Sequence, residues 1–262
     1  MYVGFIQFKV EFGQKKENLE KVTSHILKKD AELFVLPELF NSGYLFSSQT
    51  ELFALAESIP DGPTTKTLTQ LARDHRVYIA AGLPERDGTA FYNSAVLVGP
   101  QGFIGCYRKL HLFNTEKQWF KPGDASPEVY DLGEAKVGVM ICFDWIFPEV
   151  ARTLALKGAR LICHASNLVL PFCQKAMITR SIENRIFTIT ANRIGTEKRA
   201  GAELTFTGQS QVTDPEGNVL IHAGANDEKC GVVEIDLSQA SDKMITPQND
   251  LFQDRRSEFY EI

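Results

Sequence analysis

The fold of this chain is decided by one stretch of its sequence, which runs Lys136-Val137-Gly138-Val139-Met140-Ile141-Cys142-Phe143-Asp144-Trp145. The apolar, β-branched residues at 136–141 predict a buried central strand. A helix is predicted next, over Phe147–Lys157, ending at Gly158, which suits a left-handed cap. The strand therefore delivers a thiol, that of Cys142, to its carboxyl end. At such ends in α/β folds, side chains leave the sheet and ligands bind.

Short apolar runs and helical segments alternate on both sides of this stretch. Further strands are predicted at Val3–Phe8, Leu33–Leu36, Val77–Leu83, Arg160–His164, Thr188–Ala191 and Gly231–Ile235. Further helices are predicted at Lys16–Lys29, from a cap at Thr64 or Thr65 to His75, and at Gln174–Ile186. Two hairpins are predicted, Tyr92–Val98 with Gly102–Tyr107 and Gln209–Thr213 with Val219–His222.

This mixture of βαβ-like units and antiparallel hairpins predicts an α/β fold built of layers with mixed sheets. No linker, low-complexity tract or solenoid repeat divides the chain, so residues 1–262 are predicted to form a single domain. The tail at 244–262 is polar, with Asp254, Arg255 and Arg256 before two aromatic residues. Such a tail is expected to fray or to dock on a partner.

Composition and charge narrow the class of protein. The 262 residues are 44% hydrophobic, which is enough for a globular core, and their net charge of -5 argues against a nucleic-acid partner. Apolar runs such as Val137–Phe143 are too short to span a bilayer, and Met1–Lys9 predicts a strand rather than a signal peptide. Five irregularly spaced cysteines without a zinc-site pattern predict neither a disulfide framework nor a structural metal. A reducing cytoplasm is therefore expected.

Two other places break the local pattern. In Leu36-Pro37-Glu38-Leu39-Phe40 a carboxylate follows an apolar strand, and in Tyr107-Arg108-Lys109-Leu110-His111 two cations leave a hairpin strand. Taken singly, Cys142 could be inert core, Glu38 a solvated strand end, and Lys109 a surface cation. Together they supply what chemistry at a thiol needs, namely a base for its proton and a fixed cation for negative charge.

Three segments of the chain resemble the signature segments of the nitrilase superfamily, the carbon–nitrogen hydrolases. They are Leu36–Phe40, Tyr107–Phe113 and Met140–Glu149, in the family's order and at plausible separations. The resemblance covers nearly the whole chain, including Gly43-Tyr44 and Tyr92-Asn93-Ser94. It implies a four-layer α-β-β-α sandwich of two mixed sheets. It also implies a homodimer or higher oligomer in which the C-terminal tail docks on the neighbouring subunit.

The same resemblance implies a role for each polar residue of the segments. Cys142 would be the nucleophile, Glu38 the general base and Lys109 the oxyanion stabiliser, while Glu116 would match a second glutamate that positions substrate. The backbone N–H of Phe143 would join Lys109 at the oxyanion. Water would complete the reaction, and neither a metal nor an organic cofactor is expected.

A Cys-His dyad is the rival arrangement within cysteine hydrolases, and His111 and His164 are its candidates. The other cysteines have core packing as their default interpretation. Cys173 is predicted to lie in a loop that could rim the pocket. Asp144, directly after the nucleophile segment, is expected to cap or pin the following helix rather than to take part in catalysis.

The pocket is expected to be rimmed by Tyr44, Phe46, Trp119, Asn167 and Phe172, which give apolar walls and few polar anchors. Phe143-Asp144 after the thiol resembles the amidase-like branches, whereas nitrile-hydrolysing members commonly have Trp-Glu there. A small carboxamide is therefore the leading substrate class. An N-carbamoyl amine or amino acid is the second and a nitrile the third. A scaffold that kept the fold without the chemistry is the non-enzymatic alternative, which the presence of all three catalytic residue types disfavours.

Overall fold

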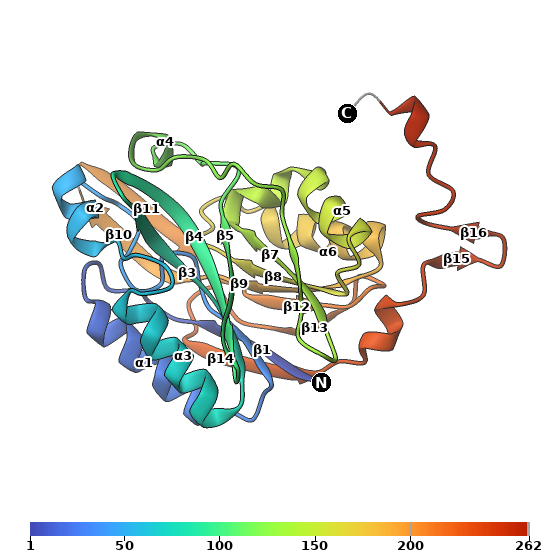
Figure 1. Ribbon diagram of the computed structural model, residues 1–262, viewed down its shortest axis with the longest axis horizontal. Coiled ribbons are helices and arrows are strands. Elements are labelled where there is room, and N and C mark those ends of the chain that lie inside the picture. Colours follow the sequence, from blue (N-terminus) through green and yellow to red (C-terminus); the bar gives the residue numbers. More distant parts are fainter. Residues whose placement is uncertain (200, 261–262) are drawn as a thin grey trace.

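The computed structural model describes residues 1–199 and 201–260, which form four layers with two sheets in the middle (Figure 1). In the described residues the first sheet has six strands, ordered β14 (Lys229–Glu234), β1 (Tyr2–Gln7), β2 (Leu33–Val35), β3 (Tyr78–Asp87), β4 (Ala90–Gly99) and β5 (Gly102–Arg108). The second is ordered β13 (Val219–His222), β12 (Gln211–Thr213), β9 (Phe187–Ala191), β8 (Leu161–Ala165), β7 (Lys136–Ile141) and β6 (Val129–Asp131).

Both sheets mix parallel and antiparallel pairing. Strands β1, β2 and β3 are parallel, as are β7, β8 and β9, while the outer strands of each sheet run antiparallel to their neighbours. The carboxyl ends of the parallel strands in one sheet therefore come together at one edge. Side chains on the two facing surfaces, such as Val3 and Phe5 against Leu161 and Phe187, form the central core. The predicted pair of mixed sheets is confirmed.

Helices cover the outer faces of both sheets (Figure 1). Helices α1 (Lys15–Leu27) and α3 (Pro63–His75) bury Val22 and Leu68 against the first sheet. Helices α5 (Pro148–Leu156) and α6 (Cys173–Asn184) cover the second sheet, where Leu154 packs with Met140. The α-β-β-α order of layers that the resemblance implied is therefore confirmed.

The cap predicted for α3 is wrong. The helix begins at Pro63 with Gly62 as its N-cap residue, so neither Thr64 nor Thr65 caps it. Proline at the first helical position has its φ already set for the helix and lacks the N–H that a cap would satisfy. Thr64 instead donates its backbone N–H to Glu57, at 2.7 Å.

Several elements escaped the sequence patterns because they are short or polar. These are α2 (Gln49–Leu55), α4 (Glu116–Trp119), the hairpin of β10 (Ile194–Arg199) and β11 (Ala202–Thr207), and the 3₁₀ turns η1 (Cys142–Ile146), η2 (Leu237–Ala240) and η3 (Ser257–Phe259). Strand β12 begins at Gln211 rather than at the predicted Gln209, whose φ of 54° places it in the left-handed region. The β10–β11 hairpin is largely polar, so hydrophobic alternation could not reveal it.

The tail predicted at 244–262 extends away from the four layers (Figure 1). It holds a short hairpin of β15 (Met244–Thr246) and β16 (Asn249–Asp250), followed by η3. Residues 261 and 262 of the predicted tail lie outside the described residues. Shortly after β16, Phe252 meets the guanidinium of Arg152 on α5, which lies 5.4 Å from the ring centre. Docking of the tail on a partner stays a prediction.

Within the described part of the chain, every helix is too short or too polar to cross a membrane. The cytoplasmic location expected from the sequence stays a prediction.

Candidate active site

The nucleophile candidate stands at the sharp turn that follows β7. Cys142 is the first residue of η1, its φ is 40°, and only 5% of it is exposed. Backbone strain of this kind persists only where surrounding contacts fix it. Asp144 supplies such a contact, because its carboxylate accepts the N–H of Ile141 at 3.0 Å and the hydroxyl of Tyr107 at 2.8 Å. Asp144 therefore pins the turn of the nucleophile, whereas the prediction that it caps the following helix is wrong, because α5 has Phe147 as its N-cap residue and no side-chain cap.

Glu38 reaches the same region from the end of β2 and is fully buried. Its backbone lies so close to β3 that a Cβ on Gly82 would come within 2.6 Å of the Cα of Glu38. Glycine at this position therefore permits the close approach that carries the carboxylate into the interior. Asn93 on β4 donates its side-chain N–H to Oε1 of Glu38, at 2.7 Å.

Lys109 follows β5 and is fully buried, with its ammonium between two carboxylates. Its Nζ is 2.7 Å from Glu38 and 2.8 Å from Glu116, which begins α4. Tyr44 donates its hydroxyl to Glu116 at 2.6 Å. Glu38, Lys109 and Glu116 thus form one connected, buried group, and their charges act on the buried thiol of Cys142.

Burial and charge set the protonation of this group. Burial raises the pKa of Glu38 to about 7, although the neighbouring Lys109 opposes the rise. Burial also raises the pKa of Cys142 well above its ordinary value, and Glu38 raises it further while Lys109 lowers it. For Lys109, burial would lower the pKa, but attraction to Glu116 and Glu38 outweighs it and raises the pKa. At neutral pH the group therefore holds a protonated thiol, a permanent cation and a carboxylate near its midpoint.

A small cavity lies against the thiol. Its volume is about 10 Å³, room for about one water molecule. Its walls are mostly apolar, and they consist of Phe113, Cys142, Phe143, Trp145, Asn167, Leu168, Val169 and Leu170. Asn167 is 2% exposed, and neither the Nδ2 nor the Oδ1 atom of its side chain has a hydrogen-bond partner in the structure. An unpartnered buried amide beside a nucleophile is a ready anchor for a polar ligand.

The other predicted pocket residues take different places. Phe46 is buried in an aromatic cluster, where its ring lies 5.8 Å from that of Phe120. Trp119 ends α4 at the border of the same cluster, and Phe172 precedes α6 with 60% of it exposed. Neither Trp119 nor Phe172 lines the cavity at Cys142. Their contact with a substrate stays a prediction.

Both histidines of the rival dyad have other partners. His111 bonds Asp144 through Nδ1 at 2.8 Å, and His164 bonds the carbonyl oxygen of Cys142 through Nε2 at 2.9 Å. Burial lowers the pKa of His164 to about 4, so its imidazole is neutral near pH 7. Each histidine thus supports the turn of the nucleophile. Cys173, which the sequence placed in a loop, is instead the fully buried first residue of α6.

A second buried ion pair, which the sequence patterns did not reveal, holds the loop that carries Tyr44. Glu197 on β10 accepts the backbone N–H groups of Tyr44, at 3.1 Å, and of Leu45. Arg193 pairs with Glu197 at 2.8 Å and donates to the carbonyl oxygen of Val10 at 2.7 Å. The signal that could have found it is a pair of charges four residues apart at the start of a polar strand. Such a pair is also common on exposed surfaces, so it is a weak signal.

No group of three or more histidine, cysteine, aspartate or glutamate side chains in the described residues is arranged to hold a metal ion.

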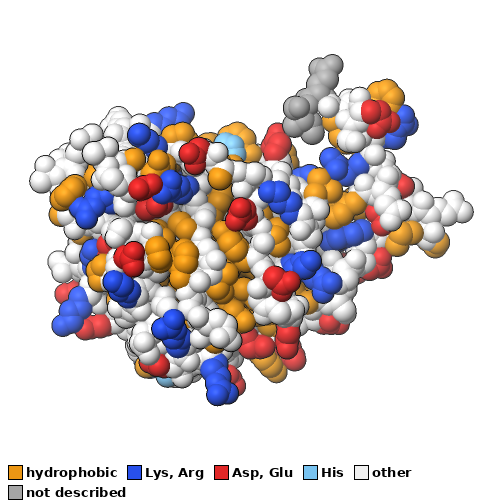
Figure 2. Space-filling view, in the orientation of Figure 1, with side chains coloured by type: hydrophobic (Ala, Val, Ile, Leu, Met, Phe, Trp, Pro, Cys, Tyr) orange, Lys and Arg blue, Asp and Glu red, His pale blue; other side chains and the backbone are white. Residues whose placement is uncertain are grey.

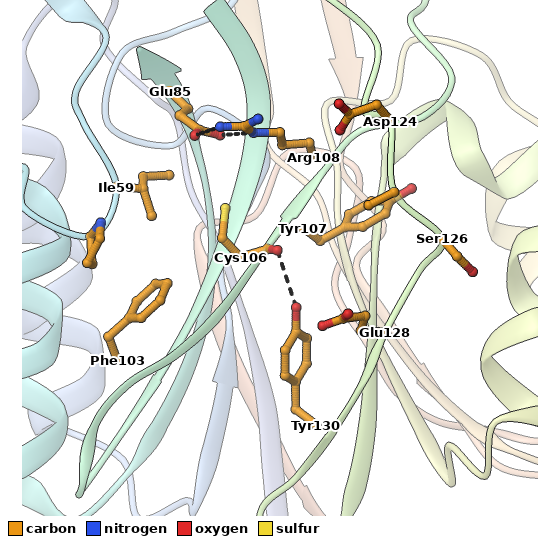
Figure 3. Close-up of a pocket in the computed structure, with 12 residues that line it drawn as sticks. Ile59, Glu85, Phe103, Cys106, Tyr107, Arg108, Asp124, Ser126, Glu128 and Tyr130 are labelled. Atoms are coloured by element: carbon orange, nitrogen blue, oxygen red, sulfur yellow. Dashed lines mark hydrogen bonds and ion pairs between the residues drawn. The ribbon is translucent and has the colours of Figure 1, made fainter. Parts of the chain in front are cut away.

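A larger cavity, of about 370 Å³, lies at the edge strand β5 and contains none of the catalytic candidates (Figure 3). Figure 2 shows hydrophobic side chains gathered over the middle of this face, with charged ones around them. Arg108 in its wall pairs with Glu85, and Tyr130 donates its hydroxyl to the carbonyl oxygen of Cys106 at 3.3 Å. Burial raises the pKa of Cys106 to about 12, so this thiol stays protonated.

Comparison with known proteins adds independent findings. The family model described as carbon-nitrogen hydrolase matches residues 3–243. The chain is 49% identical to a nitrilase of Pyrococcus abyssi (strain GE5 / Orsay), over 98% of each sequence. It is 36% identical to an (R)-stereoselective amidase of Pseudomonas sp, covering 98% of this chain and 92% of that one.

Among solved structures, the chain is similar to a mutant amidase of Nesterenkonia sp. AN1 in which the acetamide moiety of fluoroacetamide is covalently added at the active-site cysteine. The TM-score is 0.81 and the identity 25%, over 98% of this chain and 94% of that one.

If Glu197 positions Glu116 through Tyr44, then Glu197→Ala and Tyr44→Phe should each lower kcat for a hydrolysed substrate roughly tenfold or more, because each weakens a hydrogen bond to a charged group. Combining them should cost little beyond either alone, since both act through the same bond. Steady-state kinetics of the single and double variants measure this. Lys198→Ala, on the exposed face of the same strand, should leave kcat unchanged. Fully additive losses would show that Glu197 acts by another route.

Proposed function

The chain belongs to the carbon–nitrogen hydrolases of the nitrilase superfamily, and we propose from this premise that it hydrolyses a small carboxamide to the acid and ammonia through a thioester on Cys142. The observation that carries the proposal is the buried group in which the ammonium of Lys109 is held by Glu38 and Glu116 beside that thiol. The amidase relatives support an amide as the substrate class.

The first step in this proposal joins the thiol to the substrate carbonyl. Cys142 is protonated at rest, so its proton passes to Glu38 as the sulfur attacks the carbonyl carbon. A carboxylate with a pKa of about 7 can accept this proton near neutral pH and can also return it. The proton therefore passes directly from the Cys142 thiol to the Glu38 carboxylate during the attack, and a free thiolate does not have to accumulate.

Negative charge then develops on the carbonyl oxygen. Lys109 remains charged throughout, and the backbone N–H of Phe143 at the start of η1 is the second donor in this proposal. A preorganised oxyanion donor contributes roughly 3–4 kcal/mol of transition-state stabilisation. The ammonium is fixed by two carboxylates, so little reorganisation is needed when the charge appears.

The tetrahedral intermediate collapses when the carbon–nitrogen bond breaks. Glu38 gives its proton to the leaving nitrogen, which departs as ammonia and leaves a thioester on Cys142. Water, with Glu38 or Glu116 as its base, then attacks the thioester carbonyl, releasing the acid and restoring the thiol. Asn167, buried and without a side-chain partner, is the proposed anchor for the carboxamide of the substrate.

Two other substrate classes fit the same nucleophile. An N-carbamoyl compound would release carbon dioxide as well as ammonia, and a nitrile would be attacked at its nitrile carbon by the same sulfur. The sequence ranks the carbamoyl compound second and the nitrile third, but the 49% identity to a nitrilase supports moving the nitrile to second place. Product analysis separates the three classes.

Substitution of the nucleophile gives the direct test. Cys142→Ala should abolish ammonia release from every amide that the wild type hydrolyses, because no other thiol can form the thioester. Ammonia assays over a panel of amides, carbamoyl compounds and nitriles measure this with freshly reduced protein. Cys106→Ala, at the separate cavity, is the matched control and should retain activity. Undiminished activity of Cys142→Ala would remove the nucleophile assignment.

The pKa of Glu38 predicts a pH profile. The base must be ionised to accept the thiol proton, so kcat/KM should fall below pH about 7 and level off above it. Asn93→Ala removes a hydrogen bond that lowers this pKa, so it should move the acid limb to higher pH. Ser94→Ala, one residue along β4, should not. A limb that stays in place or moves to lower pH in Asn93→Ala would contradict the role of Glu38.

We further propose that the protein is a homodimer joined through α5, α6 and the tail. Large apolar side chains are exposed on this side at Ile146, Leu156 and Ile182. Light scattering should give about twice the chain mass of 29.3 kDa, and Leu156→Glu with Ile182→Glu should reduce it to the monomer. Leu27→Glu, at a still more exposed leucine on α1, should keep the dimer. A monomeric wild type would contradict the proposal.

A further inference from the structure

The cavity at Cys142 has an uncharged wall, although charged residues lie nearby. Six of its eight lining residues carry apolar side chains, namely Phe113, Phe143, Trp145, Leu168, Val169 and Leu170. The remaining two are the nucleophile and the uncharged amide of Asn167. Among the described residues that form this wall, none carries a full charge at neutral pH. An acyl group bound at the thiol therefore meets hydrocarbon on most sides.

The ammonium of Lys109 is already paired with two carboxylates. Lys109 lies 2.7 Å from Glu38 and 2.8 Å from Glu116, and all three side chains are buried. A substrate carboxylate would therefore find no unpaired cation at Lys109. A carboxylate that enters a buried site without a cation of its own is destabilised, because water cannot screen its charge.

Two other cations, Arg180 and Lys117, lie near the residues of the cavity wall, but neither is available to a substrate in the cavity. Arg180 donates to the backbone oxygen of Trp145, but its guanidinium pairs with Glu183 at 3.0 Å. Lys117 lines a separate groove beside Phe143 and does not line the cavity at the thiol. A charged substituent on the acyl group would thus lose its water without gaining an ion-pair partner.

Asn167 can satisfy an uncharged group. Its side chain offers an NH2 group as donor and a carbonyl oxygen as acceptor, both buried and unpartnered, which suit the C=O and N–H of a carboxamide. Polar recognition is therefore available at the scissile amide, whereas the walls beyond it are apolar. The volume of about 10 Å³ means that the wall must also yield before any acyl chain enters.

Building on the proposed amidase function, we infer that the enzyme selects small, uncharged acyl groups and rejects amides whose acyl chain carries a carboxylate. The selecting elements are the apolar segment Leu168–Leu170 and Trp145, in a wall whose described residues include no cation. Charge, rather than size alone, is the property that this site distinguishes.

Three amides of similar size test this inference with the wild-type enzyme at pH 8. Butyramide carries an apolar chain, succinamate places a carboxylate at its end, and succinamide replaces that carboxylate by a neutral amide. The expected kcat/KM is at least 100-fold lower for succinamate than for butyramide, with succinamide much nearer to butyramide. A succinamate value within tenfold of butyramide would overturn the inference. An equally large loss for succinamide would also overturn it, because polarity and not charge would then be selected.

A paired substitution at the wall provides a second arm. Val169 is partly exposed, so a longer side chain can place its end at the mouth of the cavity. Val169→Lys should raise the ratio of succinamate to butyramide kcat/KM at least tenfold, whereas Val169→Met, of similar length and uncharged, should not. A loss of active protein does not change this ratio, since it lowers the measured rates for both substrates by the same factor. An unchanged ratio in the lysine variant would contradict charge selection at this wall.

The same assays separate a failure of the acyl-group selectivity from a failure of the amidase function. If amides are hydrolysed without regard to charge, the amidase function stands and the selectivity is wrong. If no amide is hydrolysed by reduced wild-type protein, the amidase function fails and the selectivity fails with it.

Discussion

The ammonium of Lys109, fully buried between the carboxylates of Glu38 and Glu116, is the interaction on which the rest of the site depends. Removing one partner from such a buried group costs about 3–5 kcal/mol, because the charges left behind stay unpaired. The three residues come from the end of β2, the end of β5 and the start of α4. Strands β2 and β5 belong to the first sheet, where β3 and β4 lie between them, so the strand order of that sheet brings these segments together. Catalytic electrostatics and folding are therefore coupled in one cluster.

The surrounding structure holds this cluster from two directions. On one side, Asp144 fixes the strained turn of Cys142 through the backbone of Ile141 and the hydroxyl of Tyr107. On the other, Glu197 holds the backbone of the loop whose Tyr44 bonds Glu116. In each case the carboxylate accepts a backbone N–H, whose position depends on the backbone conformation and not on a side-chain rotamer. A buried carboxylate thus positions its neighbours in both cases, rather than reacting itself.

The sequence predicted the parts of the fold that depend on hydrophobic periodicity. Strands such as β7 and helices such as α5 bury apolar faces, so their patterns are visible without the structure. Glu38, Lys109 and Cys142 could be predicted from the sequence, because each lies beside an apolar strand and their segments resemble those of a family. The β10–β11 hairpin could not be predicted from the sequence, since its charged residues serve a tertiary contact. The positions of Trp119 and Phe172 also depend on loop packing, which no local pattern encodes.

The central claim is that Cys142 becomes acylated during turnover, and intact-protein mass spectrometry after rapid acid quench tests it most directly. With a hydrolysed amide, the mass should rise by that of the acyl group, and peptide mapping should place it on Cys142. The increase should be absent from Cys142→Ala. Continued hydrolysis with the acyl group on another cysteine, or with Cys142→Ala still active and never acylated, would contradict the account.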